Sequence, residues 1–455
     1  MTITLIYDII LTVCTSNYST TSINNNIGEN RMNTAIVTVN NVIGVVFLLL
    51  YLYQFYYIFV ALAKKPKKYA QNDQTNRYAV LIAARNEEKV IGNLIKSLQS
   101  QDYPSENLDI YVVADNCTDN TAEIVRSLGA NVYERFNKEQ VGKGYALNFL
   151  LKKIEQACGI RSYKAYFIFD ADNILENNYV TEMDKAFCAG SRVVTSYRNS
   201  KNYGQSWVAS GYALWFLREA RYLNNPRSLL GSSGAVSGTG FMVSSEVFEK
   251  NDGWKHHLLT EDIEFSVDMI IRGEVIGYCH DAVFYDEQPV TFKQSWTQRM
   301  RWAKGFLQVY RNYGGKLFCG MFGKNSFSCF DMTMSILPAF IFTVVSMIYN
   351  WGSLVFSLIK YGSVSSEMLF YAFNFIVFEY VLMFFLGLIT LISERKNILC
   401  KTSKAILHLF MFPIFMLSYI PISIVALFTK VGWKQISHSV SVSLDDMKKQ
   451  KDHSA

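Results

Sequence analysis

Four long stretches of this chain carry almost no charge, and they constrain its fold more than any other feature. Residues 41–63, 335–359 and 405–428 contain no Asp, Glu, Lys or Arg, and residues 368–392 contain only Glu379. A helix needs about 20 apolar residues to cross a bilayer, and each stretch reaches that length. The sequence therefore predicts transmembrane α-helices at these four positions.

Basic residues beside these stretches predict their orientation, because cytoplasmic loops carry an excess of Lys and Arg. The run KKPKK directly follows the first stretch, which predicts that the N-terminus lies outside and residues 64–325 lie in the cytoplasm. At the C-terminal end of the chain, two topologies stay open. A complete crossing by 405–428 would put the basic tail 429–455 outside, whereas Pro413 and Pro421 can instead break that stretch into a re-entrant or interfacial pair.

Residues 1–40 are predicted to form a disordered N-terminal extension. Their apolar part, 3–14, is too short to span and is interrupted by Asp8, and residues 15–31 are rich in Ser, Thr and Asn. Met32 precedes the first long apolar stretch and is a candidate for the natural start.

Composition agrees with a membrane protein that has a large polar part. Charged residues make up 18% of the chain, against about 25% in soluble domains. The net charge of +6 is too dilute over 455 residues to predict nucleic-acid binding. The eight cysteines show no CxxC pair or zinc spacing, which predicts reduced thiols in a reducing compartment.

Between the first and second stretches, residues 64–325 have the alternating pattern of an α/β domain. Short apolar strands are predicted at 78–84, 108–114, 131–134 and 166–169, and amphipathic helices at 87–101, 121–128 and 144–157. This alternation predicts a parallel sheet covered on both faces. Ligands of such sheets bind at the carboxyl ends of the strands.

Acidic residues follow two of these strands. Asp115 ends the second strand and is a candidate nucleoside contact, although it or Asp119 can instead cap the next helix. Asp170 and Asp172 follow the fourth strand, and two carboxylates suit Mg²⁺ or Mn²⁺ bound with substrate phosphates, unless they form only a polar turn. Glu87 follows the first strand and either lines the same pocket or caps a helix.

Two glycine-containing segments suggest close approach of backbone to a ligand. Lys143 stands between Gly142 and Gly144, where it either faces a phosphate or merely precedes a helix. A glycine-rich loop at 231–240 ends in Gly238, Thr239 and Gly240, and either approaches a ligand or has no special role.

Two further motifs carry groups suited to catalysis. Glu261 and Asp262 precede a helical pattern, where a carboxylate acts as a general base or simply favours the helix N-terminus. Gln298, Arg301 and Trp302 lie in an amphipathic basic-aromatic stretch, predicted as an interfacial helix near 294–313. There Arg can bind a departing diphosphate and Trp can face a sugar ring.

The order of these motifs resembles the signature of membrane-bound family 2 glycosyltransferases. Asp115, the DxD at 170–172, the TED at 260–262 and the QxxRW at 298–302 follow one another as in the processive β-glycan synthases, the group of poly-N-acetylglucosamine, hyaluronan, cellulose and chitin synthases. The resemblance covers about residues 41–430 and does not specify the sugar.

The resemblance implies an α/β GT-A domain with a Rossmann-like sheet, joined to transmembrane helices. It implies that Asp115, Lys143, Glu87, Asp170 and Asp172 bind a UDP-sugar, with the last two holding Mg²⁺ or Mn²⁺. Asp262, with Glu261 beside it, would be the general base. Residues implied for the acceptor and diphosphate are Gln298, Arg301, Trp302, Gly238, Thr239 and Gly240.

The predicted function is inverting transfer from a UDP-sugar, with UDP-N-acetylglucosamine as first candidate, to a growing β-linked polysaccharide at the plasma membrane. The alternative is addition of one sugar to a lipid or lipid-linked acceptor. A different class of function, a transporter or an inactive nucleotide-binding scaffold, is a further alternative. The complete set of acidic motif residues argues against it. The small membrane part also suggests an accessory membrane subunit.

Overall fold

The computed structural model describes residues 27–71, 75–336, 338–433, 438, 440 and 442–447. Contacts within the chain divide it into two units. One comprises the chain up to Gly44 with Ser346–Phe373, and the other comprises Val45–Val345 with the chain from Asn374 onward. Each unit is described by itself below.

An eight-stranded sheet forms the centre of the second unit, and we call residues 75–336, which contain it, the sheet domain. Its strand order is β3-β2-β1-β4-β7-β6-β8-β5. The strands are β1 (Tyr78–Ala84), β2 (Leu108–Asp115), β3 (Asn131–Arg135), β4 (Ala165–Asp170), β5 (Ile174–Leu175), β6 (Val193–Ser200), β7 (Phe241–Ser244) and β8 (Ile276–Asp286). The four strands predicted from the sequence are present within about one residue of their predicted ends.

The direction of the strands corrects the expected parallel sheet. Strands β3, β2, β1 and β4 are parallel to their neighbours, but β7 runs antiparallel to both β4 and β6. The glycine-rich loop sits at the carboxyl end of β4, where Gly240 donates its N–H to Ile168. Because β7 begins there, it returns along β4 in the opposite direction, and the sheet is mixed.

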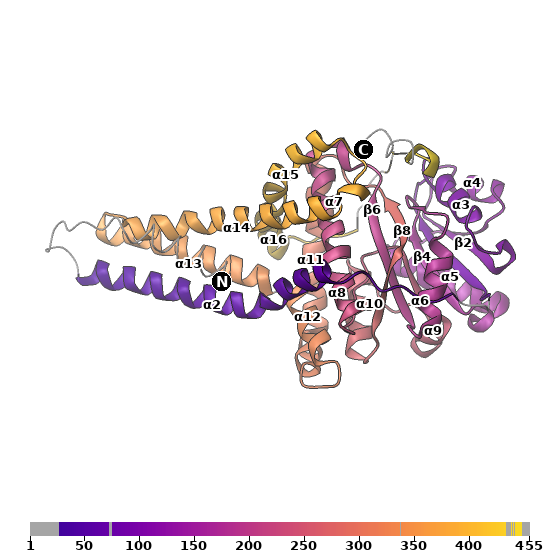
Figure 1. Cartoon of the computed structure of the whole chain (residues 1–455), viewed down its shortest axis with the longest axis horizontal. Helices are drawn as coiled ribbons and strands as arrows, with labels where there is room; N and C mark the ends of the chain where they lie inside the picture. The colour runs from indigo at the N-terminus through magenta and orange to yellow at the C-terminus, as the bar shows by residue number, and fades with distance from the viewer. Residues whose placement is uncertain are drawn as a thin grey trace. The chain divides into compact units, whose positions relative to one another are not determined.

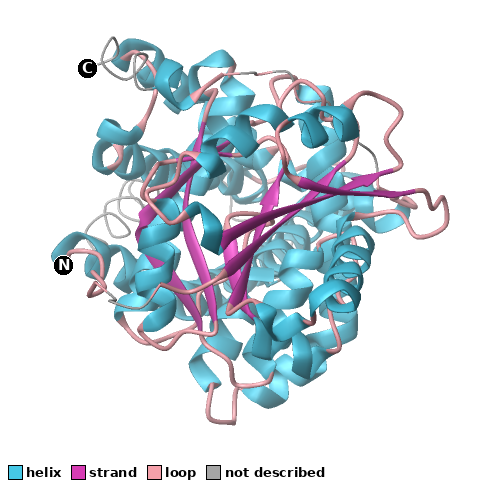
Figure 2. Ribbon diagram, turned by 90° about the vertical axis from the view of Figure 1, so that its right-hand side faces the viewer, coloured by secondary structure: helices cyan, strands magenta, loops and turns pink. Residues whose placement is uncertain are grey.

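Helices cover both faces of this sheet (Figure 2). Alternate residues of β1 enter two different cores, with Tyr78, Val80 and Ile82 on one face and Ala79 and Leu81 on the other. The first face packs against α3 (Ile91–Gln99), α4 (Thr121–Ser127) and α6 (Tyr179–Cys188), and the second against α5 (Lys143–Cys158), α9 (Ser245–Asn251) and α10 (Glu261–Ile271).

A further group of helices lies beside β6 and β8 (Figure 1). It contains α7 (Trp207–Glu219), α8 (Asn225–Leu229), α11 (Phe292–Gly320) and α12 (Ser326–Ile336). The predicted interfacial helix is α11, and it extends further than expected at both ends. It begins with a capping box, in which Thr291 and Gln294 bond each other's backbone N–H groups.

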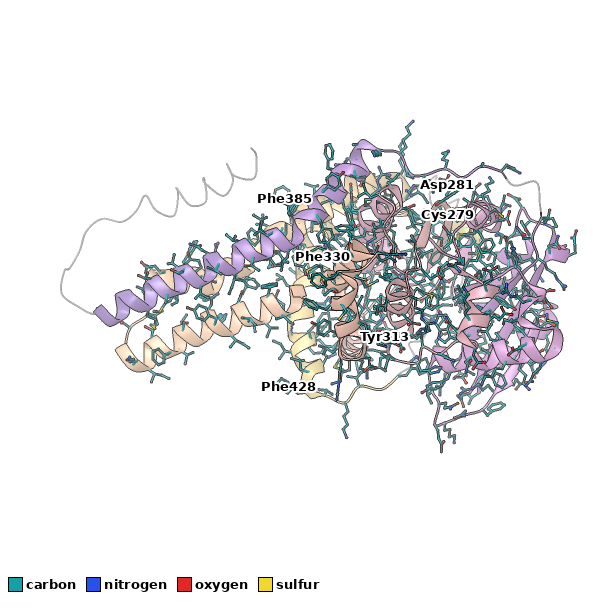
Figure 3. The ribbon with its side chains drawn as sticks, turned by 90° about the horizontal axis from the view of Figure 1, so that it is seen from below. Cys279, Asp281, Tyr313, Phe330, Phe385 and Phe428 are labelled. Atoms are coloured by element: carbon teal, nitrogen blue, oxygen red, sulfur yellow. The ribbon has the colours of Figure 1, made fainter. Side chains whose placement is uncertain are left out.

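Four segments are long and apolar enough to cross a membrane, as predicted: Met32–Ala63, Ile341–Lys360, Ser366–Ser393 and Thr402–Phe428. They belong to α2 (Ile27–Ala63), α13 (Pro338–Tyr361), α14 (Ser366–Ser393), α15 (Thr402–Leu417) and α16 (Tyr419–Phe428). Figure 3 shows Phe385 of α14 on the same side of the sheet as Phe330 of α12, away from Cys279 of β8.

The N-terminal prediction is wrong for residues 27–40, which are helical rather than disordered. Within the first unit, Asn40 exchanges two hydrogen bonds with Asn350 of α13, at 2.7 and 2.9 Å, and Ser365 donates to Asn33 at 2.9 Å. These partners lie more than 300 residues away in sequence, so the local pattern does not reveal them. Met32 lies inside α2, and residues 1–26 lie outside the described part.

The last apolar segment is broken into two helices that lie on the sheet domain. Helix α15 ends at Leu417, and α16 begins after Ser418. Arg299 of α11 donates to the Phe415 carbonyl at 2.7 Å and to Ser418 at 2.8 Å, and Lys304 donates to the carbonyl of Ala426 at 2.9 Å. Arg299 and Lys304 of α11 thus hold the break between α15 and α16 and the C-terminal end of α16.

The tail beyond α16 also contacts the sheet domain. The Arg85 guanidinium lies 4.9 Å from the centre of the Trp433 ring. The backbone N–H of Val440 donates to Glu287 at 2.9 Å. Residues on both sides of the α15–α16 pair therefore lie against the same domain.

Candidate active site

A cavity of about 580 Å³ opens at the carboxyl ends of β1, β2 and β4. It brings together nearly all of the residues predicted for the site. The lining includes Glu87, Asp115, Lys143, Asp170, Asp172, Gly238, Glu261, Asp262, Gln298, Arg301 and Trp302. Of the predicted residues, Thr239 and Gly240 alone are absent from the lining.

Asp115 is held by an arginine that the sequence did not single out. Arg135 of β3 donates from Nη1 to the Asp115 carboxylate at 2.5 Å and from Nη2 to the Gln140 carbonyl at 2.8 Å. Both partners of the ion pair are buried. Asp119, just before α4, accepts the Thr121 backbone N–H at 3.1 Å. Asp115 instead pairs with Arg135 and lines the cavity.

The two carboxylates of the DxD are held by different partners. Lys143 pairs with Asp170 and also donates to the Gly238 carbonyl at 2.7 Å. Asp172 is buried and accepts the Glu287 backbone N–H at 2.8 Å. Burial opposes the charge of Asp172, but nearby cations, His438 first, lower the pKa of its carboxyl below the usual value.

The predicted glycine-rich residues divide into one that faces the cavity and two that support it. A Cβ placed on Gly238 would lie 3.7 Å from Asp262 Oδ2, so this backbone runs beside the predicted base. Thr239 accepts the Asp170 N–H at 2.8 Å and donates to Asn173, which holds the end of β4. Gly240 is buried against Phe284, where a Cβ would come within 2.1 Å of that ring.

His438, which the sequence left inside an unassigned tail, lies within the acidic side of the cavity. Its Nδ1 is 3.0 and 3.1 Å from the two carboxylate oxygens of Glu87. Burial alone would lower the pKa of this imidazole, but Asp172 and Glu87 outweigh it and raise the pKa of His438 to about 10. These carboxylates therefore favour the protonated form of the imidazole at neutral pH.

Glu261 and Asp262 form the first turn of α10, as the sequence suggested. Desolvation raises the pKa of Asp262 above that of a free carboxyl. Burial, and then the charge of Asp262, raise the pKa of Glu261 to about 7. A carboxylate with a raised pKa, partly open to a cavity, is suited to accept a proton.

Helix α11 brings the QxxRW residues to the same place. Arg301 donates to the Leu259 carbonyl at 2.8 Å, just before the TED. The Trp302 ring packs edge-on against Tyr212, with centroids 5.6 Å apart. Gln298 Oε1 is buried without a hydrogen-bond partner in the described part of the chain. Gln298 thus lines the cavity with its Oε1 atom itself buried.

The distance between α11 and α10 depends on Gly305. A Cβ on Gly305 would come within 2.5 Å of the Thr260 side chain, which starts the first turn of α10. We expect Gly305→Ala to push α11 outward and lower transfer by about tenfold or more, since small displacements of positioned groups are costly.

The matched control for this change is Gly315→Ala on the same helix, where the added Cβ meets nothing within 4 Å. Initial-rate assays and thermal melts of both variants separate positioning from stability. Equal activity of the two variants would contradict the close-packing argument.

The acidic rim offers two carboxylates, Asp170 and Asp172, to a divalent cation. Among the residues that the structure describes, no group of three or more His, Cys, Asp or Glu side chains forms a complete cage. Asp170 and Asp172 nevertheless both line the cavity. Carboxylates of this kind fit an ion that takes its remaining ligands from a substrate diphosphate and water.

Comparison with known proteins agrees with the motif order. The family described as "Glycosyltransferase like family 2" matches residues 76–305, half of the chain. The chain belongs to this family. The predicted family 2 membership is thus confirmed, with four apolar helices beside its GT-A-type domain.

Named relatives of this family 2 chain include a β-monoglucosyldiacylglycerol synthase of Nostoc sp., 26% identical over 60% of this chain and 59% of the relative. Another is a poly-β-1,6-N-acetyl-D-glucosamine synthase of Staphylococcus epidermidis, 25% identical over 53% of this chain and 57% of the relative. The matched part thus spans less than two thirds of these relatives' own length.

A solved structure supports the fold. The mannosyltransferase PcManGT of Pyrobaculum calidifontis, in complex with GDP-Man and Mn²⁺, aligns with a TM-score of 0.54 at 14% identity, covering 87% of this chain and 98% of that one. This likeness confirms the predicted GT-A architecture.

Proposed function

We propose that this chain is an inverting glycosyltransferase that moves a sugar from a UDP-sugar to a hydroxyl presented at the membrane. The observation that carries the proposal is the meeting of Asp262, Arg301 and the DxD carboxylates in one cavity. The relatives support it, since they are named for transfer of glucosyl and N-acetylglucosaminyl units.

The residues suggest a single displacement. Asp262 accepts the proton of the acceptor hydroxyl, whose oxygen attacks the anomeric carbon from the face opposite the diphosphate. The bond to the diphosphate breaks, UDP leaves with the electron pair, and the proton on Asp262 passes to solvent. Arg301, Lys143 and His438 offset the charge that develops on the leaving group. No covalent intermediate is needed.

The proposed metal is Mg²⁺ or Mn²⁺, held by Asp172 and Asp170 together with the diphosphate. When bound, it would supply positive charge at the leaving group. Asp170 is paired with Lys143 in the structure, so this pair would have to open when the metal binds. Asp115 and Glu87 would then contact the nucleoside side of the donor.

Transfer should be lost on the acid side at a higher pH than a free aspartate would give. The proposed base acts only when ionised, and desolvation raises the pKa of Asp262. Glu261, with a pKa of about 7, is already protonated over this limb, so Glu261→Gln should leave the acid limb of the kcat profile in place. Rates at saturating donor, measured between pH 4 and 9, would show both. An acid limb at the pH of a free aspartate would contradict Asp262 as the base.

Replacing His438 with Ala should raise the donor KM about tenfold, with a smaller change in kcat. The cation beside Glu87 and Asp172 is lost, and the diphosphate then meets uncompensated carboxylates. His438→Lys keeps the charge and is expected to recover part of the affinity. Titration calorimetry with UDP checks both variants, and equal UDP affinity in wild type and His438→Ala would contradict the role.

The acceptor was predicted to be a growing β-linked polysaccharide, with a lipid as the alternative. Relatives named for both product types are found, so their names do not separate the two acceptors. The shape and chemistry of the cavity favour the lipid, as argued in the next subsection. The predicted accessory membrane subunit stays a prediction.

We also propose that three segments cross the membrane and that the sheet domain lies in the cytoplasm. Helix α15 packs on α7, its end and α16 contact α11, and the tail after them returns to Arg85 and Glu287. A re-entrant pair keeps the basic tail on the same side as the basic run after α2, which agrees with the positive-inside rule. This topology removes the conflict found in the sequence.

A further inference from the structure

The cavity has two chemically different halves. Carboxylates and cations line it at the carboxyl ends of the strands, whereas side chains of α7, α8, α11 and α12 to α16 line the rest of the wall. The proposed base, Asp262, lies at the polar half beside Gly238. Whatever fills the second half must therefore be joined to the attacking hydroxyl.

The second half is mainly apolar. Its side chains include Met332, Met334, Ile336, Met383, Met416 and Ile420. Methionine is unbranched and flexible, and its side chains adapt to apolar ligands of varied shape. This surface fits hydrocarbon.

A sugar chain would be a poor occupant of this half. Every sugar ring brings several hydroxyls, and each one buried without a partner costs free energy. The Ser335 hydroxyl already donates to the Asp331 carbonyl at 2.8 Å, which reduces the polar groups on offer. Methionine and isoleucine side chains provide no strong hydrogen-bonding groups to replace water.

The charge of this half disfavours a phosphate. Glu379 is an acidic residue of the lining, and among the described lining residues of α12–α16 none is basic. Arg227 also lines the cavity, where it is paired with Asp331. A phosphate would find no basic side chain among the described lining residues of α12–α16, whereas a neutral head group can exchange a hydrogen bond with Glu379.

The wall on the α14 side is one helix thick. Met383 and Glu379 face the cavity, while Phe378 and Phe385 of the same helix are 52% and 59% exposed. The position of Phe385 on the outside of α14 is visible in Figure 3. Because α14 is long and apolar enough to span a bilayer, its exposed face suits contact with lipid.

We propose that the acceptor is an uncharged lipid with a free hydroxyl, whose head reaches Asp262 and whose hydrocarbon lies between α12, α14 and the α15–α16 pair. This inference rests on the proposed glycosyl transfer. The lipid oxygen forms the new bond to the anomeric carbon, its proton goes to Asp262, and UDP departs with the electrons of the broken bond. Glu379 is a positioning residue that accepts a hydrogen bond from a second polar group of the head.

The test uses the purified full chain in nanodiscs with Mn²⁺ and a panel of UDP-sugars. Three acceptors are compared: 1,2-dioleoylglycerol, undecaprenyl phosphate and a chito-oligosaccharide. UDP release, thin-layer chromatography and gel filtration report transfer, glycolipid and polymer. Met383→Trp fills the apolar half, and Leu382→Trp is the matched control because Leu382, the preceding residue of α14, does not line the cavity.

The expected result is a glycolipid from dioleoylglycerol, with transfer lowered about tenfold or more in Met383→Trp and unchanged in Leu382→Trp. Donor affinity, measured with UDP, should stay constant in both. Glu379→Leu should raise the KM for the lipid more than it lowers kcat, and Glu379→Gln should recover part of the affinity.

Several outcomes would overturn the inference. A high-molecular-weight polymer without glycolipid, or preferred transfer to undecaprenyl phosphate, would overturn it while leaving glycosyl transfer intact. Equal lipid transfer by wild type and Met383→Trp would show that the hydrocarbon lies elsewhere. No UDP release with any donor and acceptor, equally in Asp262→Asn, would instead remove the proposed function itself.

Discussion

Asp262→Asn is expected to lower sugar transfer by about 10²–10⁴-fold, because a positioned general base contributes roughly that much to a rate. The amide has nearly the shape of the carboxylate but cannot take the acceptor's proton. Donor binding should persist, since the diphosphate partners Lys143, Arg301 and the DxD are unchanged. Transfer is measured as UDP release with acceptor present, and binding by calorimetry with UDP.

Asp268→Asn is the matched control for this change. Asp268 lies on the same helix, pairs with His256 at 3.1 Å and with Arg272 at 2.9 Å, and is absent from the cavity lining. It should cost some stability but leave the rate per folded molecule close to wild type. Full activity in Asp262→Asn, or equal losses in the two variants, would reject Asp262 as the base.

The second large effect is expected for Asp331→Ala, which should lower the free energy of unfolding. Arg227 donates to its carboxylate at 2.7 and 2.8 Å, and Tyr53 and Tyr57 of α2 donate at 3.0 and 2.9 Å. Both charged partners are buried. Asp331→Ala leaves the arginine without a counter-charge, and breaking such a pair costs about 3–5 kcal/mol. Unfolding in detergent by heat or denaturant would measure the loss.

A double replacement separates the pair from its surroundings. Arg227→Met with Asp331→Leu removes both charges and should recover much of the stability lost by Asp331→Ala, because apolar residues avoid the desolvation cost. The exposed pair of Arg161 with Glu249 is the control, and Glu249→Gln should have no measurable effect on stability. Wild-type stability in Asp331→Ala would contradict the prediction.

The local pattern of apolar residues was sufficient to predict the strands at the centre of the sheet. Residues 78–84 and 110–114 are continuous apolar runs, and parallel strands buried on both faces require such runs. The acidic residues at their ends lie at the same rim because parallel strands end together. The direction of β7 was not predictable in this way, since a run of three apolar residues, Phe241–Val243, is equally compatible with either strand direction.

The residues of the site likewise divide into those that a local sequence motif predicted and those that it did not. Asp170, Asp172 and Asp262 were found because the chemistry needs carboxylates at positions that a short motif marks. Arg135, Lys201 and His438 carry no such mark, although Arg135 holds Asp115 and His438 contacts Glu87. Lys201 donates to the Asp172 carbonyl at 2.7 Å from just beyond β6. Each of these partners acts from another part of the chain, so spacing along the sequence does not reveal it.

The sequence by itself determined the four apolar segments long enough to span a membrane, the α/β class and the family, because apolar length, strand–helix alternation and motif order are properties of the linear chain. The tertiary structure alone decided that the last apolar segment folds as two helices onto α11, that the tail reaches the acidic rim, and that methionines from α12, α14 and α15 share one cavity with the proposed base. These features depend on contacts between residues far apart in the chain, which are set by packing and buried charge and leave no periodic pattern in the sequence.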